Sequence, residues 1–170
     1  MLTNRRALAC STFLFVVGCS DATEPLTGAS GVFGAQLEGV RSAMLSGSAE
    51  AQKVFIETGS EFVVRMLAES GNVGRFVVLQ CPGDTAPTPG TYAVGPGRDC
   101  LARYLLLRST PDSGSSFTEF AEAEEGRVIV DVSNEEEIDG TFIFQGTLVQ
   151  GSDTVGGLSA RGSFRAKVFP

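Results

Sequence analysis

The sequence predicts an all-β fold, either an antiparallel sandwich or a small barrel of about 8–10 short strands with at most one short helix. Three observations support this prediction. Apolar and polar residues alternate in several short stretches. Turn-forming residues separate these stretches. The 170 residues include 21 glycines and 7 prolines, which interrupt any long helical pattern.

The predicted strands lie after residue 31. Runs rich in β-branched and aromatic residues favour strands, and such runs occupy 61–67, 75–81, 102–108, 127–132 and 141–148. The clearest alternation comes last, at 160–168, where Arg161, Arg165 and Lys167 alternate with small or apolar residues. A period of two with one polar face predicts an antiparallel strand that is exposed on one side.

Turn-forming residues separate the runs, and they occur at 70–72, 111–114 and 151–153. The segment 117–125 (FTEFAEAEE) leaves two interpretations open. Ser116 could cap a short helix with a thin apolar stripe of Phe117, Phe120 and Ala121. The alternative is a strand or a loop.

Two cysteines flank a connection rich in proline and glycine. Cys81 and Cys100 enclose residues 82–99, which hold four of the seven prolines and a short expected strand at 91–94. In an exported chain such an even pair predicts a disulfide. A metal-binding pair and two free thiols are the alternatives, but the sequence has no histidine to complete a metal site.

The first eighteen residues have the layout of a secretory signal peptide. Arg5 and Arg6 precede an uncharged, mostly apolar stretch at 7–17, and the small residue Gly18 follows. This stretch is too short to span a bilayer as a helix. A buried core helix and a twin-arginine signal are the alternatives.

The end of this stretch, Val16-Val17-Gly18-Cys19, resembles the lipobox of bacterial lipoproteins. The resemblance implies a thioether-linked diacylglycerol on Cys19, cleavage before Cys19, and acylation of the new amine by a fatty acid such as palmitate. Two or more acyl chains anchor a protein stably. By the sorting rule of that family, Ser20 implies the outer membrane if the source has two membranes. The expected location is therefore the bacterial cell envelope.

The expected organisation is a signal peptide at 1–18, a flexible tether at 19–31 and a single β domain at 32–170. The tether is small and polar, and about twelve such residues span on the order of 20 Å as a coil. The leader holds two arginines and no acid, so its removal would take the formal net charge from −7 to −9. Such an acidic chain is not expected to bind nucleic acid.

Four segments of the C-terminal half recur in a fixed order. They are Gly90-Thr91-Tyr92, Gly126 to Val130, Ile138 to Phe144 (IDGTFIF) and Gly162-Ser163-Phe164. This order resembles a family of small bacterial lipoproteins with an uncharacterised all-β domain, whose strands carry I-x-G-T-F and G-x-F. The resemblance covers residues 90–168 and implies a fold and an envelope location. It implies no activity, cofactor or catalytic residue, and the Cys81–Cys100 pair departs from it.

The usual catalytic motifs are absent from the sequence. Without histidine, the Ser-His-Asp and Cys-His arrangements and the common zinc sites are excluded. The sequence also lacks a G-x-S-x-G elbow, an S-x-x-K pair, a P-loop and a G-x-G-x-x-G segment. We therefore expect no catalytic residue and no cofactor. A hydrolase that uses two carboxylates alone is the remaining enzymatic alternative.

An acidic segment at 131–140 leaves a calcium site as an alternative, with Asp131, Glu135, Glu137 and Asp139 as ligands. The segment lacks the glycine and the final glutamate of an EF-hand loop. A hydrated hairpin turn is the preferred interpretation, so no metal is expected.

These observations predict a lipid-anchored envelope protein whose β domain is non-catalytic and has a binding or structural role. Its expected partner is the membrane, through Cys19, and its protein or small-molecule ligand is not identified by the sequence. An inhibitor of a cationic hydrolase such as lysozyme is the alternative, because the acidic charge would speed association with such a partner.

Overall fold

The computed structural model describes residues 31–57, 59–110 and 114–169. Within these residues the chain forms nine strands and no helix. The strands are β1 (Val32–Gly39), β2 (Ala43–Ile56), β3 (Gly59–Ser70), β4 (Val73–Pro82), β5 (Gly90–Val94), β6 (Leu101–Thr110), β7 (Gly114–Ser133), β8 (Glu137–Gln150) and β9 (Asp153–Phe169). The predicted all-β class and the predicted number of strands are confirmed.

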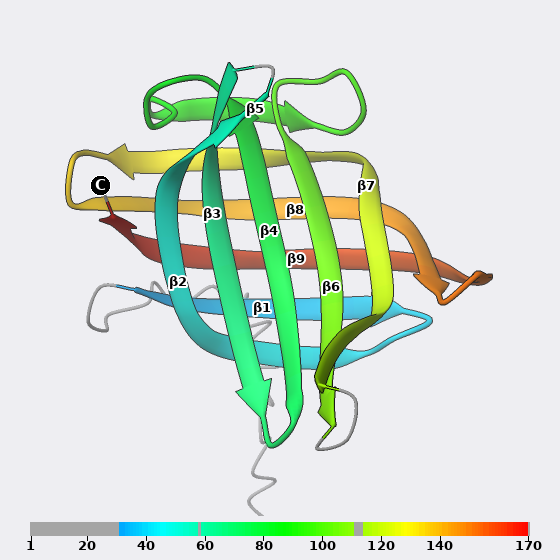
Figure 1. The fold of residues 1–170 in the computed structure, drawn as a ribbon. Coiled ribbons are helices and arrows are strands. Elements are labelled where there is room, and N and C mark those ends of the chain that lie inside the picture. The colour runs from blue at the N-terminus through cyan, green and yellow to red at the C-terminus, as the bar shows by residue number, and fades with distance from the viewer. Residues whose placement is uncertain (1–30, 58, 111–113, 170) are drawn as a thin grey trace, which may run out of the picture.

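The strands form one sheet that closes into a ring. Its order is β5-β7-β6-β4-β3-β2-β1-β9-β8, and pairings of β7 with β8 and of β2 with β9 close it. The strand pairs are antiparallel except for a short parallel contact between residues 50–52 and 167–169. Figure 1 shows two layers of strands that cross at a steep angle, with β2 and β7 bending from one layer into the other. The ring is therefore flattened into a sandwich-like shape.

The core lies between the two layers. Side chains alternate between the faces of each strand, and the inward set is apolar over most of its length. Large, fully buried side chains come from both layers, and they include Phe33, Leu37, Met66, Val77, Leu79, Tyr104, Ile138, Phe144, Leu148 and Leu158. Removing this apolar surface from water is the main favourable contribution to folding.

The I-x-G-T-F and G-x-F segments meet in the ladder between β8 and β9. Phe142 lies opposite Gly162, and Gly140 lies opposite Phe164. The rings of Phe142 and Phe164 are 6.5 Å apart. A methyl group on Gly162 would press against the carbonyl oxygen of Gly34 on the next strand. The glycines therefore leave room both for the phenyl rings and for close approach of the neighbouring strand.

Of the two interpretations of 117–125, the structure shows the strand. This segment lies inside β7, which has 20 residues and pairs with β6 on one side and with β8 on the other. Two ladders of backbone hydrogen bonds outweigh a weak local helical preference. The strands are also longer than expected, because β2, β7, β8 and β9 each run through a bend or past a bulge or turn of the sheet without stopping.

The connection between the cysteines contains the expected short strand, observed as β5, which pairs with β7. The expected turns at 70–72 and 151–153 join β3 to β4 and β8 to β9. Gly71 and Gly151 each have a φ of 61°, a conformation that glycine adopts without steric cost. Among the described residues, no helix has the length and apolar character needed to cross a membrane.

Candidate functional site

At one end of the ring the inward positions change from apolar to polar. Glu119 on β7 lies opposite Gln150 at the end of β8. The turn between β1 and β2 adds Arg41, and β6 adds the buried Tyr104. In the described part of the chain Glu119 is the only buried charged residue, with 6% of its surface exposed. We call Arg41, Tyr104, Glu119 and Gln150 the Glu119 cluster.

A β-bulge sets the direction in which Glu119 points. The register between β6 and β7 shifts by one residue, so that Leu106 lies opposite Glu119 while Leu107 lies opposite Phe117. Thr118 is the extra residue, and its hydroxyl donates a hydrogen bond to the carbonyl oxygen of Leu106 at 3.4 Å. An extra residue breaks the alternation of faces. Glu119 is therefore turned into the ring, whereas Phe117 is turned out to solvent.

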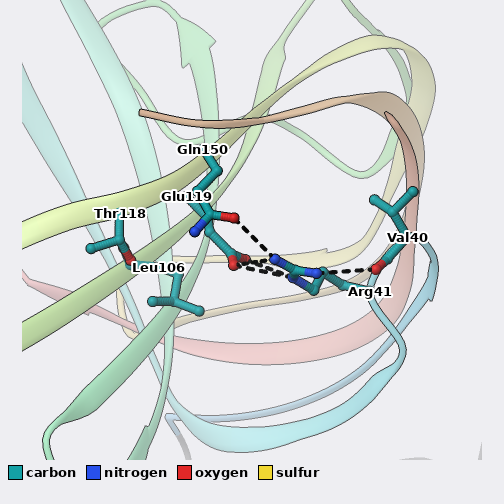
Figure 2. Close-up of polar contacts among 6 residues, drawn as sticks. All are labelled: Val40, Arg41, Leu106, Thr118, Glu119 and Gln150. Carbon is teal, nitrogen blue, oxygen red and sulfur yellow. Dashed lines mark hydrogen bonds and ion pairs between the residues drawn. The ribbon is translucent and has the colours of Figure 1, made fainter. Parts of the chain in front are cut away.

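The guanidinium of Arg41 holds the carboxylate of Glu119 through two of its nitrogens, Nε and Nη2 (Figure 2). Nη2 donates to Oε1 at 2.8 Å, and Nε lies 3.1 and 3.3 Å from the two carboxylate oxygens. Nη2 also donates to Oε1 of Gln150 at 3.3 Å, and Nη1 donates to the carbonyl oxygen of Val40 at 3.4 Å. These bonds join the β1–β2 turn to β7 and β8.

The charges in the cluster act on the ionisation of its members. The hydrogen bond to Glu119 raises the pKa of Arg41 above its usual value, and the negative charge of Glu119 adds to this effect. Burial raises the pKa of Tyr104, again with a contribution from the charge of Glu119, while Arg75 and Arg41 oppose the shift. Arg41 therefore stays charged, and Tyr104 stays neutral, over the physiological range.

This arrangement is suited to a structural role, in which Arg41 links the β1–β2 turn to β7 and β8. Both carboxylate oxygens of Glu119 already accept hydrogen bonds from Arg41. A general base must reach a proton of a substrate, whereas Glu119 is buried and held in an ion pair at one end of the ring. The chemistry of the cluster therefore fits the fixing of one end of the ring better than proton transfer.

A second polar region lies beside the disulfide, where a surface groove has a volume of about 490 Å³. The end of β4, the connection after it and β5 line this groove, through residues 81–83, 85–88, 91, 92 and 99. The hydroxyl of Tyr92 donates to the carbonyl oxygen of Thr88 at 2.7 Å, and Asp99 Oδ2 accepts from the backbone N–H of Ala93 at 2.8 Å. These bonds and the disulfide hold the groove walls in place.

The groove offers hydrogen-bonding groups without a catalytic pair. Of its ten described lining residues, three are threonines, one is a tyrosine and one is an aspartate, and none is a lysine, arginine or histidine. Such a lining can bind a polar ligand, but it lacks a nucleophile beside an activating group. The groove is therefore a candidate binding site.

The connection that forms one wall of the groove is tied to the β2–β3 hairpin. Asp84 accepts a hydrogen bond from the hydroxyl of Ser60 and lies 3.4 Å from Lys53 Nζ. The bond from Ser60 is the main reason that the pKa of Asp84 lies below its usual value, and Lys53 contributes further. A negative Asp84 thus links the connection to β2 and β3.

The predicted disulfide is confirmed, because Cys81 and Cys100 are bonded across a sequence separation of 19. It joins the end of β4 to the residue just before β6, at the rim of the groove. The predicted lipidation site, Cys19, lies outside the described residues.

The four carboxylates of the calcium alternative lie at or near the β7–β8 hairpin. Arg165 Nε donates to both oxygens of Asp139, at 3.1 and 3.0 Å, and lies 4.0 Å from Glu137. Asp131 and Glu135 are exposed. Among the described residues, no three or more His, Cys, Asp and Glu side chains are grouped so that they could hold a metal ion. In the turn, Asn134 Oδ1 accepts hydrogen bonds from the backbone N–H groups of Glu136 and Glu137.

Sequence reasoning missed the Glu119 cluster. The acid-rich segment around Glu119 suggests a hydrated surface, and the bulge at Thr118 that turns one of these acids inward has no clear signature in the sequence. Arg41 follows a strand end with no motif around it. Pairing of an isolated arginine with an acid 78 positions away depends on ring closure, which local patterns do not encode.

Comparisons of the chain with models of protein families, with curated proteins and with solved structures find no match.

Proposed function

We propose that the protein is an exported bacterial lipoprotein, anchored in the cell envelope by lipid on Cys19, with a non-catalytic β domain that has a binding role. The observation that carries the proposal is the lipobox-like segment Val16-Val17-Gly18-Cys19 at the end of a basic and then apolar leader. The position, the apolar run and the basic start agree with one another.

The disulfide supports the export part of the proposal. Structural disulfides persist in oxidising compartments and are rare in the reducing cytosol. The two cysteines that follow the leader and the lipobox are the two that pair, Cys81 with Cys100. The cysteine usage of the whole chain is therefore consistent with a chain that leaves the cytosol.

The start of the β domain lies within reach of the proposed anchor. Gly31 is the first described residue, and its N–H donates to the carbonyl oxygen of Arg165 at 3.0 Å. Gly31 lies twelve positions after Cys19. A chain of that length reaches at most about 40 Å when fully extended. A lipid on Cys19 would therefore keep the domain near the membrane surface.

The groove beside the disulfide supports a binding role. Its walls are fixed by the disulfide and by the hydrogen bonds of Tyr92 and Asp99, so little ordering would be needed when a ligand binds. Its hydroxyl groups and single carboxylate fit a polar ligand. The Glu119 carboxylate, which is the buried acid, is already bound by Arg41.

Detergent phase partition of the full chain, expressed in bacteria, tests this proposal. The natural chain should enter the detergent phase and incorporate labelled fatty acid, and Cys19→Ala should do neither. Cys10→Ala is the matched control, because it removes a leader cysteine outside the lipobox and should leave partition and labelling unchanged. If Cys19→Ala still partitions into detergent and still takes up label, the proposed anchor is wrong.

A further inference from the structure

The outer face of the sheet carries an apolar row that crosses five strands. Its members are direct register partners from one strand to the next, from β3 through β4, β6 and β7 to β8. They are Leu67, Phe76, Leu105, Phe120 and Val149. We call these five residues the apolar row. Ser48 on β2 and Thr154 on β9 lie at its two ends.

The side chains of this region touch one another on the outside of the ring. The rings of Phe76 and Phe117 are 6.5 Å apart in an edge-to-face arrangement. A methyl group placed on Gly74 would come within 3.2 Å of the Phe76 ring and 3.5 Å of the Leu67 side chain. Phe117 is 62% exposed and Phe120 is 37% exposed. Leu67, Phe76 and Phe117 therefore lie close together, and Leu105, Phe120 and Val149 continue the row in register along the same face.

Such a surface is unexpected on the solvent side of an antiparallel sheet, where polar residues normally alternate with the core positions. The bulge at Thr118 contributes to it, because it turns Phe117 outward beside Leu107. A clustered apolar patch with a polar rim marks an interaction site more often than a random surface does. Figure 1 shows β3, β4, β6 and the first part of β7 side by side in the front layer, and these strands carry all of these residues except Val149.

We propose that this face packs against the same face of a second copy of the chain. A two-fold axis along the front-layer part of the apolar row would place Leu67, Phe76, Leu105 and Phe120 each against its own copy. On β3 it would also bring opposite charges together. Arg65 and Glu69 are exposed on β3 on either side of Leu67, and the axis puts Arg65 of one copy opposite Glu69 of the other. The interface would thus hold this ion pair twice.

The polar rim of the patch is compatible with burial. Arg103 and Glu122 lie directly beside the row and form an ion pair at 2.9 Å. Arg103 also donates to Oε1 of Gln80 at 2.6 Å, and Gln80 donates to Glu61 at 3.0 Å. The charges of Arg103 and Glu122 are therefore already paired with each other. This pairing lowers the free-energy cost of removing them from water when a dimer forms.

The area of the patch determines the expected affinity of the dimer. Four front-layer strands spaced about 4.8 Å apart and three rows spaced about 7 Å apart cover on the order of 400 Å². Two copies would bury roughly 800 Å², which is at the low end, where weak and transient contacts lie. The expected dimer is therefore weak and reversible. It depends on the fold alone, and not on the proposed lipid anchor.

A bilayer fits this face less well. The patch lies on a sheet face and not at a projecting loop, and it is flanked by the exposed Glu69. A bilayer supplies no cation fixed opposite this acid, and the formal net charge of −7 is repelled by anionic lipid. A second copy supplies Arg65 opposite Glu69.

Disulfide trapping in cells that produce the full chain tests the proposal. Leu105 lies on the middle strand of the row and would face its own copy, so Leu105→Cys should give a covalent dimer on a non-reducing gel. Gln145→Cys is the matched control, because Gln145 is exposed on β8, about 14 Å along the strand from the row. It should remain monomeric. Equal cross-linking of both variants, or of neither, would overturn the proposal.

Charge exchange tests the orientation of the two copies. Sedimentation of the purified full chain in mild detergent should show reversible dimers. Arg65→Glu and Glu69→Arg should each weaken the dimer several-fold, and the double exchange should restore it. Phe120→Glu should raise the dimer dissociation constant on the order of tenfold or more, whereas Phe55→Glu, at a 79% exposed residue outside the patch, should not. A monomer at all concentrations, or vesicle binding that is lost with Phe120→Glu, would contradict a second copy as the occupant.

Discussion

Arg41 and Glu119 lie 78 positions apart in the sequence, and in the structure Arg41 Nη2 contacts Glu119 Oε1 at 2.8 Å. The pair closes one end of the ring, because it joins the turn after β1 to the interior face of β7. Its two members differ in exposure: 39% for the arginine side chain and 6% for the glutamate. Loss of the arginine would leave a buried carboxylate without its partner.

We therefore expect Arg41→Met to destabilise the domain and the double variant Arg41→Met/Glu119→Leu to recover most of the loss. A buried charge without a partner is costly, whereas an apolar pair of similar volume is tolerated. Urea denaturation of the natural chain, the single variant and the double variant measures the free energy of unfolding of each. Arg161→Met is the control, because Arg161 pairs with Glu38 at the surface, where ion pairs contribute little. A double variant no more stable than Arg41→Met would contradict this explanation.

The disulfide between Cys81 and Cys100 should stabilise the domain because it closes a loop in the unfolded chain. A bridge over a separation of 19 residues restricts the unfolded chain, which is worth about 3 kcal/mol in the chain-entropy treatment. The variant Cys81→Ser/Cys100→Ser should lose roughly that amount in denaturant unfolding, and a reducing agent should have the same effect on the natural chain. If reduction leaves the unfolding midpoint unchanged, the bridge does not contribute in this way.

A residue larger than glycine at position 162 should destabilise the domain. A methyl group there would press on the backbone of Gly34 and Ala35 of β1, so Gly162→Ala should cost about 1–3 kcal/mol. Gly34→Ala on the neighbouring strand is the matched control, because its added methyl group meets nothing within 4 Å. It should be neutral or slightly stabilising. Thermal unfolding of both variants tests this prediction. Equal losses of stability in the two variants would show that the close approach of β9 to β1 is not what requires glycine at position 162.

Tyr104 should ionise only at unusually high pH. Burial raises its pKa, which means that the unfolded chain loses this proton first as the pH rises. The neutral Tyr104 hydroxyl therefore makes its full contribution to the free energy of unfolding below about pH 10. This contribution is lost as the pH rises through the pKa of Tyr104 in the folded state. Ultraviolet titration of a Tyr92→Phe chain, which retains Tyr104 alone, should show a midpoint above 10 that returns to about 10 in denaturant. The same midpoint in both states would contradict the buried environment.

Much of the fold could be predicted from the sequence, because its signals are local. The alternation at 160–168 marks β9, and the turns at 70–72 and 151–153 mark two hairpins. The long bent strands could not be predicted, since bending depends on how the two layers wrap around one core. Residues 117–125 show the limit clearly: their composition permits a helix, and pairing with β6 and β8 makes them a strand.

The candidate sites were less predictable than the fold. The disulfide follows from cysteine number and spacing, so it was predicted and is confirmed. The groove depends on how the proline-rich connection folds back on β4 and β5, and the Glu119 cluster depends on the bulge at Thr118. The apolar row depends on register across five strands. Register is set by the closed ring, so single stretches of sequence do not reveal it.

The most direct test of the proposed function is the mass of the natural amino terminus, measured on full chain purified from the membranes of a bacterial host. The proposal predicts a chain that begins at Cys19 and carries the added mass of a diacylglycerol and a fatty acyl group. An intact leader, or a terminus at another residue without fatty chains, would contradict it.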